Sequence, residues 1–296
     1  MSRNYADCNL TTNEANNDIN HREGDRIMAQ ENRNATTERP PTGFERITQI
    51  IKIPVEFETI GTLSIMSGIG DGVLDNTVQR TGNGDYDFAI TGSSLKGVTR
   101  STIEAMLANV EKVCAPMACA PQRQTIPGRL EDCGEVIRKT TRERKSIPSG
   151  LPCAVCQMFG STWQKGKVVF RDAQIVDAEG ATPIPRTHVA IDREKGTASP
   201  RALTTIETLP KGLTFSGSVG LTNAADWMIG AVIYVLDEII EEVGLGAKTN
   251  AGYGQLCVKV GDPKFVFPPQ QTPETFRKHC LDEWFKKLKI DPPSNN

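Results

Sequence analysis

The feature that most constrains the fold is a helix that runs directly into a glycine-rich turn and then into a strand. Residues 224–243, AADWMIGAVIYVLDEIIEEV, have a strongly apolar helical pattern, and Gly244 and Gly246 end it. Residues 244–254, GLGAKTNAGYG, lead into a predicted strand at 255–260. Backbone amides in such a turn can approach a phosphate because no side chain blocks them. The spacing fits neither a P-loop nor a dinucleotide-binding loop, and an ordinary glycine-rich turn remains the simpler interpretation of this segment alone.

The remaining apolar pattern predicts the order strand, helix, strands, helix, strand. The predicted strands are 47–58, 167–177 and 213–221, and the further predicted helices are 95–113 and 273–288. Ser93 or Ser94 could cap the first of these helices. This order predicts an α+β fold with a ferredoxin-like or RRM-like core and an antiparallel sheet.

Composition divides the chain into three parts. Residues 1–43 are rich in Asn, Glu and Arg, and we predict a flexible tail that is either a disordered leader or an arm that orders on a neighbouring subunit. Residues 44–265 form the predicted RRM-like domain, and residues 266–296 form a C-terminal helix and tail. Within the domain, 114–156 is a predicted insertion and 183–212 a predicted projecting hairpin.

Charge and hydropathy limit how the chain could bind nucleic acid and argue against a membrane. The formal net charge is −2, so no global basic field attracts nucleic acid, and any RNA binding must use local basic patches. No apolar run is long enough to span a bilayer, and the first residues lack a signal-peptide core. We therefore expect a cytoplasmic protein with no membrane association.

Four ordered segments resemble the RAMP superfamily, the repeat-associated RNA-binding proteins of CRISPR systems, and in particular its type III backbone subunits. The family usually has proline at the position of Thr91. The four segments are Ile90 to Arg100, Cys153 to Ser161, His188 to Phe215, and the glycine-rich turn 244–254. The resemblance implies a subunit that binds crRNA, pairs it with target RNA and assembles with other CRISPR effector subunits, including related backbone subunits.

The resemblance also implies which residues contact RNA. Serines and amides at a helix N-terminus suit a phosphate, although a plain helix cap with solvated basic residues explains them equally well. The segment around Arg193 resembles the thumb hairpin that wedges into the guide–target duplex, whereas an exposed charged hairpin is the simpler alternative. The implied RNA-binding residues are Ser93, Ser94, Lys96, Arg100, Arg193, Lys195, Gly246, Lys248, Asn250 and Gly252.

Catalysis in the family depends on an aspartate in the loop that precedes the glycine-serine motif. Asp75 best matches that position, and Asp71 is a second candidate. The resemblance implies cleavage that needs Mg²⁺ or another divalent metal and leaves a cyclic phosphate, so that the RNA's own 2′-hydroxyl attacks. A turn-capping role for Asp75 beside Asn76 is the structural alternative.

Three other functions stay open. The chain could be a backbone subunit that only binds crRNA, or a stand-alone ribonuclease that processes precursor crRNA. Such processing enzymes often use histidine, and this chain has only three. The third possibility is a zinc-stabilised binding module with no role in RNA.

Five cysteines between residues 114 and 156 predict a structural zinc site. The Cys-x-x-Cys pair supplies half of a tetrahedral shell, and our chosen ligands are Cys114, Cys133, Cys153 and Cys156, with Cys119 as an alternate. Buried free thiols are the alternative. The same insertion carries Arg138, Lys139, Arg142, Arg144 and Lys145, which could reach RNA or simply be solvated.

Overall fold

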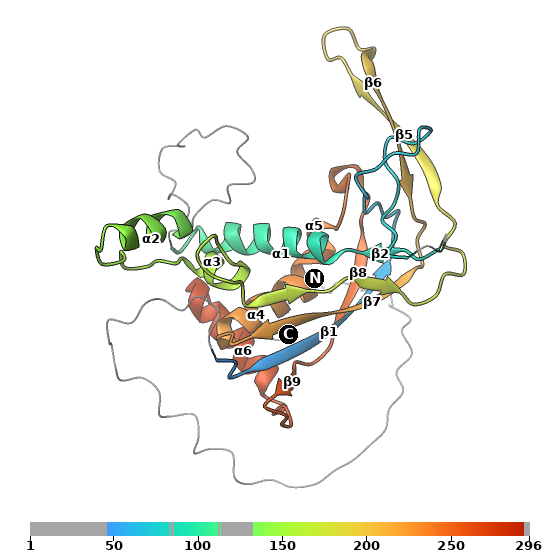
Figure 1. The fold of residues 1–296 in the computed structure, drawn as a ribbon. Coiled ribbons are helices and arrows are strands. Elements are labelled where there is room, and N and C mark those ends of the chain that lie inside the picture. Colours follow the sequence, from blue (N-terminus) through green and yellow to red (C-terminus); the bar gives the residue numbers. More distant parts are fainter. Residues whose placement is uncertain (1–45, 83, 85, 112, 114–132, 293–296) are drawn as a thin grey trace. The chain divides into compact units, whose positions relative to one another are not determined.

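The computed structural model describes most of the chain in the part that follows the predicted tail (Figure 1). Its described residues are 46–82, 84, 86–111, 113 and 133–292. The predicted tail at 1–43 lies outside them, and so do two of the candidate zinc ligands, Cys114 and Cys119.

A central strand, β1 (Ile50–Thr59), organises the sheet. Its residues alternate between buried and partly exposed positions, with Ile51, Ile53, Val55 and Phe57 turned into the core. β7 (Thr214–Thr222) pairs with one edge of β1 and β8 (Leu256–Val260) with the other, both antiparallel. The period-two apolar pattern of β1 therefore fixes which face of the sheet meets the helices.

Short strands extend the sheet on both sides. The strand path is β2-β4-β7-β1-β8, with β3 also paired to β7 and β9 to β1. Their bounds are β2 (Ala89–Ile90), β3 (Val168–Phe170), β4 (Ala173–Ile175) and β9 (Lys264–Phe267). The sequence predicted one strand over 167–177, but it is divided at Arg171 and Asp172 because Asp172 turns its carboxylate to the amide of Gly92 at 2.7 Å.

Two helical segments lie on the core side of this sheet. α1 (Gly92–Leu107) buries Leu95, Thr99, Ile103 and Leu107, a spacing of four residues on one helix face. The predicted helix at 224–243 forms α4 (Asp226–Tyr234), a π-helical turn (Val235–Ile239) and α5 (Ile240–Val243) in unbroken succession. Gly244, with φ of +73°, ends it.

α6 (Phe276–Leu288) packs closely across α4. At Gly230 of α4, a Cβ atom would collide with the carbonyl oxygen of Cys280 on α6, so only glycine permits this approach. Trp227 and Trp284 stack with ring centroids 6.4 Å apart at the same contact. The C-terminal helix is therefore part of the packed core rather than an appendage.

Two segments leave the sheet. The segment 183–212 forms an antiparallel hairpin of β5 (Ile184–Ile191) and β6 (Ala198–Thr208), which Figure 1 shows extending away from the sheet. The described part of the cysteine-rich insertion forms α2 (Cys133–Arg142) and α3 (Ala154–Phe159).

The connectivity of the core is that of a ferredoxin-like fold. β1, α1, the β3–β4 pair, β7, the α4–α5 helix and β8 follow one another as β-α-β-β-α-β, and all their strand pairings are antiparallel. The predicted α+β class and ferredoxin-like core are confirmed. Among the described residues, no helix combines the length and the apolar character needed to cross a membrane.

Candidate nucleic-acid interface and metal centre

The N-terminus of α1 begins earlier than the sequence suggested, because Thr91 caps it. The Thr91 Oγ1 atom accepts the amide of Ser94 at 3.2 Å and also contacts the Ser93 hydroxyl at 3.0 Å. The expected cap at Ser93 or Ser94 is therefore wrong: a threonine stands where the resembling proteins have proline, and it takes that role. Because Asp172 accepts the Gly92 amide, two of the first-turn donors are already used.

Lys96 and Arg100 lie on the partly exposed side of α1. Arg100 donates from Nε to Glu104 Oε1 at 2.8 Å, one helical turn away. Neutralisation by Glu104 reduces the charge that Arg100 can offer to a phosphate.

The glycine-rich turn lies over the chain that follows β1. Ala247 donates its amide to Ser64 O at 2.8 Å, and a Cβ atom on Gly246 would lie 2.5 Å from the same oxygen. Lys248, in a left-handed conformation with φ of +61°, opens a short 3₁₀ turn (Thr249–Ala251) that Gly252 closes. Lys248, Asn250 and Gly252 are all exposed.

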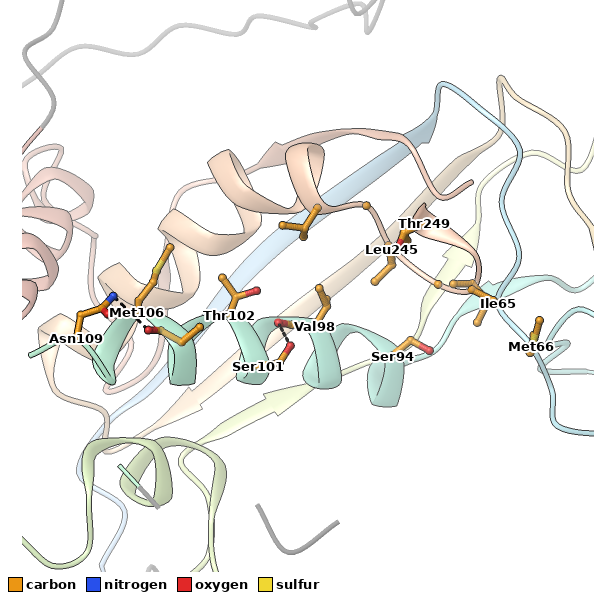
Figure 2. A pocket seen from close by; sticks show the side chains of 15 residues that line it. Ile65, Met66, Ser94, Val98, Ser101, Thr102, Met106, Asn109, Leu245 and Thr249 are labelled. Carbon is orange, nitrogen blue, oxygen red and sulfur yellow. Dashed lines mark hydrogen bonds between the residues drawn. The ribbon is translucent and has the colours of Figure 1, made fainter. Parts of the chain in front are cut away.

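A groove of about 880 Å³ separates α1 from this turn. Figure 2 shows Ser94, Val98 and Met106 of α1 on one side, with Leu245 and Thr249 on the other. The structure therefore brings Ser94 and the glycine-rich turn, which are 150 positions apart in the sequence, to the two walls of one groove.

Asp75 lies at the base of the β5–β6 hairpin. Its Oδ2 accepts the amide of Thr205 at 2.6 Å, and its own amide donates to Thr205 O at 2.8 Å. The next residue, Asn76, forms a parallel bridge with Ile206. Asp75 is exposed, and these contacts orient its carboxylate.

Asp71, the second candidate, closes a turn in the same loop. Its Oδ1 accepts the amides of Leu74 at 2.7 Å and Val73 at 2.9 Å. These backbone hydrogen bonds, that from Leu74 above all, hold the pKa of the Asp71 carboxyl below its usual range. The turn-capping role that sequence reasoning offered as an alternative for Asp75 is thus seen at Asp71.

Glu207 and Arg80 also fasten the loop to the hairpin, and sequence reasoning assigned neither a role. The Glu207 carboxylate accepts hydrogen bonds from both terminal nitrogens of Arg80, each at 3.1 Å, and from the amide of Val78 at 2.8 Å. Such a paired geometry is typical of a strong arginine–carboxylate contact. The only sequence signal was an isolated acid in the motif that resembles the family's hairpin.

The hairpin also touches the glycine-rich turn at its base. The ring centroids of His188 and Tyr253 are 5.5 Å apart, and His188 Nε2 is buried without a hydrogen-bond partner among the described residues. Arg193 and Lys195 instead lie in the exposed turn at the hairpin tip, where Asp192 Oδ1 accepts the amide of Lys195 at 3.1 Å. The structure does not bring these two cations to the groove.

Three of the expected metal ligands lie together. The Sγ atoms of Cys133, Cys153 and Cys156 are within 4.8 Å of one another, and all three residues are buried. The amide of Cys153 donates to Cys133 Sγ at 3.4 Å, which links α2 to the start of α3. Three convergent thiols could hold a metal ion such as zinc, which takes four soft ligands in structural sites.

Cys280 has no place in this cluster. It is buried in α6, where burial first and then the carboxylates of Asp226 and Glu283 raise the pKa of its thiol to about 12. The thiolate form that binds metal is therefore disfavoured at this position. The other two candidate ligands, Cys114 and Cys119, lie outside the described residues.

Comparison with known proteins agrees with this arrangement. No curated protein matches the chain. The RAMP superfamily model matches residues 58–257, a span that contains β1's end, α1, the hairpin and the glycine-rich turn. The superfamily is one of CRISPR-associated RNA-binding proteins, so the match indicates that kind of function. Because the match spans more than half of its residues, the chain belongs to the RAMP superfamily.

Proposed function

We propose that the chain is a crRNA-binding backbone subunit of a type III CRISPR effector complex that cleaves complementary single-stranded target RNA. The observation that carries this proposal is the exposed Asp75 carboxylate, oriented by the Thr205 amide at the base of a projecting hairpin. The protein would act as an endoribonuclease in the cytoplasm, together with crRNA, target RNA, related backbone subunits and other effector subunits.

The groove between α1 and the glycine-rich turn suits the guide backbone. Ser93 is exposed at the first turn of α1, and Lys96 adds a positive charge to the same helix. Lys248 and Asn250 are exposed in the turn whose residues 244–247 and Thr249 form the opposite wall, and its glycines allow close approach of a strand. Arg100, already paired with Glu104, would add less than the sequence suggested.

The hairpin suits a role as the thumb between guide and target. Arg193 and Lys195 at its tip are exposed and could contact the phosphates of the paired strands. Because the hairpin base holds Asp75, a strand displaced by the hairpin would have a flexible, unstacked nucleotide near the carboxylate.

The proposed reaction is an internal transesterification. The 2′-oxygen of the target RNA attacks the adjacent phosphorus, the bond from phosphorus to the 5′-oxygen breaks, and the leaving 5′-oxygen takes a proton from water. The products carry a 2′,3′-cyclic phosphate and a 5′-hydroxyl. Asp75 would accept the proton of the 2′-hydroxyl or orient that group. Alternatively, Asp75 would help to hold a Mg²⁺ ion, which would supply charge neutralisation at the phosphate.

The cysteine cluster suits a structural role for zinc. Cys133, Cys153 and Cys156 would provide three ligands, and Cys114 or Cys119 would provide the fourth. A complete thiolate shell leaves no open position for a reactive water, so this metal would hold the insertion in place rather than take part in cleavage.

Substitution of Asp75 in the assembled complex tests the proposal. We expect Asp75→Ala to lower the rate of guided target cleavage by about 10²- to 10⁴-fold while crRNA retention stays unchanged. Asp71→Asn is the matched control, since it changes a carboxylate in the same loop. Loss of cleavage in Asp71→Asn alone would move the catalytic role to the second candidate.

A binding-only backbone subunit is the main alternative. The paired hydrogen bonds between Asp75 and Thr205 favour it, since they also suit a purely structural anchor for the loop. Unchanged target cleavage by the Asp75→Ala complex would support this alternative. Cleavage of precursor crRNA by the isolated chain would instead support a stand-alone processing ribonuclease.

A further inference from the structure

The exposed face of α2 and the turn after it carry the densest group of basic side chains in the described part of the insertion. Five cations stand against one acid, Glu143, between residues 138 and 145, and one further acid of α2, Glu135, lies one helical turn before them. They are Arg138, Lys139, Arg142, Arg144 and Lys145, and all are exposed. We call this group the α2 basic patch.

Most of the α2 basic patch is not neutralised by any residue that the structure describes. Lys145 pairs with Glu143 at 2.7 Å, whereas Arg138, Lys139, Arg142 and Arg144 have no acidic partner among the described residues. Favourable interaction with the helix dipole accounts for Lys139 and Arg142 in the last turn of α2, but not for Arg144 beyond its end. The patch therefore has charge available for an external anion.

The buried side of α2 is firmly anchored, so the patch is presented on a fixed element. Cys133 and Ile137 on that side have no exposed surface, and Cys133 Sγ accepts the amide of Cys153. A rigid arrangement of cations loses little conformational entropy when it binds a charged strand.

The composition of the patch favours nucleic acid over protein as the partner. Protein interfaces are depleted in lysine and enriched in arginine and in aromatic and large apolar anchors, and the patch offers the arginines without those anchors. Among the described residues from 133 to 150, no large hydrophobic side chain is exposed. Clustered Arg and Lys without apolar neighbours are instead typical of contacts with a phosphate backbone.

We infer that the α2 basic patch is a second RNA-binding surface, which holds the phosphates of a single-stranded RNA segment away from the hairpin. Figure 1 shows α2 beyond the end of α1 that lies opposite the β5–β6 hairpin. The patch would thus contact RNA that extends past the groove and the Asp75 loop. This inference rests on the proposed RNA-binding function and adds a contact to it.

Salt dependence of RNA binding tests the inference. The triple variant Arg138→Gln, Lys139→Gln and Arg142→Gln would be compared with the full wild-type chain on a labelled single-stranded oligouridylate. We expect the slope of log K against log salt concentration to become shallower by about 2, since each lost phosphate contact changes it by about 0.7. The Kd at physiological salt should rise on the order of 10-fold.

A second triple variant serves as the matched control. Lys278→Gln and Lys286→Gln on the exposed face of α6, with Lys289→Gln directly after the helix, remove the same charge, and we expect the wild-type slope. Photo-crosslinking of the wild-type chain to the oligouridylate should label the peptide that contains α2. Circular dichroism would establish that each variant is folded.

Three outcomes would overturn the inference, and a fourth separates it from the proposed function. An unchanged slope in the α2 variant, or an equal change in the α6 variant, would mean that the patch makes no specific phosphate contact. Weaker association with an acidic protein partner and no change with RNA would identify a protein surface instead. If the wild-type chain bound no RNA, the proposed function itself would fail.

Discussion

At the base of the β5–β6 hairpin, the loop that carries Asp75 is held by peptide hydrogen bonds and by the ion pair between Arg80 and Glu207. The cysteine-rich insertion, in contrast, is gathered around three buried thiols that link α2 to α3. Both segments leave the ferredoxin-like core. Hydrogen bonds and an ion pair hold the Asp75 loop, whereas three buried thiols that could bind a metal hold the insertion.

The difference has consequences for what each segment can do. Hydrogen bonds and ion pairs at a partly exposed junction leave the Asp75 carboxylate accessible and allow adjustment when a strand binds. The three thiols of the insertion are buried, so a metal ion bound to them would fix the geometry of the segment away from solvent. Such a segment suits presentation of a rigid charged surface rather than chemistry.

Removal of two thiols should produce the largest change in stability. We expect Cys153→Ser with Cys156→Ser to abolish zinc binding and to destabilise the insertion by about 3 kcal/mol, which lowers Tm by roughly 10 °C. Metal analysis and calorimetry measure these effects, and hydrogen exchange should localise the loss to α2 and α3. Such a loss would sharpen the contrast between the two segments.

Cys280→Ser is the matched control for the thiol variants. It alters a buried cysteine outside the cluster, so it should leave the metal content unchanged. An unchanged metal content in the double variant would contradict the assignment of these cysteines as ligands and would remove the contrast with the hairpin junction.

Loss of the ion pair at the hairpin junction should have an intermediate effect. The Glu207 side chain is only 12% exposed, so Glu207→Gln should cost about 1–3 kcal/mol of unfolding free energy because Arg80 loses a charged partner. We also expect guided cleavage at saturating RNA to slow about 10-fold, since a small displacement of a catalytic group is costly. Chemical denaturation and single-turnover kinetics measure the two effects.

Glu143→Gln provides the comparison for that experiment. It removes the ion pair between Glu143 and Lys145, whose side chains are 41% and 71% exposed, respectively. We therefore expect the free energy of unfolding to change by no more than about 0.5 kcal/mol. If both glutamine variants behaved alike, the junction would be no more than an ordinary surface contact. Full cleavage activity in Glu207→Gln would show that Asp75 is positioned without it.

Titration of Asp71 should give the smallest effect. Because hydrogen bonds from Leu74 and Val73 lower the pKa of this carboxyl in the folded state, its contribution to stability is present above the unfolded pKa. That contribution is lost as the pH falls through the lower, folded pKa, below about pH 4. Carboxyl chemical shifts measured by NMR should show a depressed inflection, and an inflection at the ordinary aspartate value would contradict the turn geometry.

Much of the core could be predicted because its signals are local. The apolar alternation in β1 and the long apolar helix before Gly244 depend on neighbouring residues, so period and turn chemistry suffice to identify them. The start of α1 was missed because three hydroxyl residues compete for the cap, and only the backbone conformation selects Thr91.

The candidate site was harder to predict because its contacts join distant parts of the chain. Asp75 and Thr205 are 130 positions apart, and Arg80 and Glu207 are 127 apart. A single sequence contains no period or spacing that relates such residues. Only the resemblance to the family's motif ranked Asp75 above Asp71, and the sequence did not show that one closes a local turn while the other meets the hairpin.

The sequence by itself determined the strand and helix order, the position of the glycine-rich turn and the presence of a cysteine-rich insertion, because each depends on residues close together in the chain. Only the tertiary structure decided which aspartate faces the hairpin, which cations are neutralised and which cysteines converge. The physical reason is that a hydrogen bond or a ligand shell requires distances of a few ångströms, and folding alone brings residues so far apart in the chain to that range.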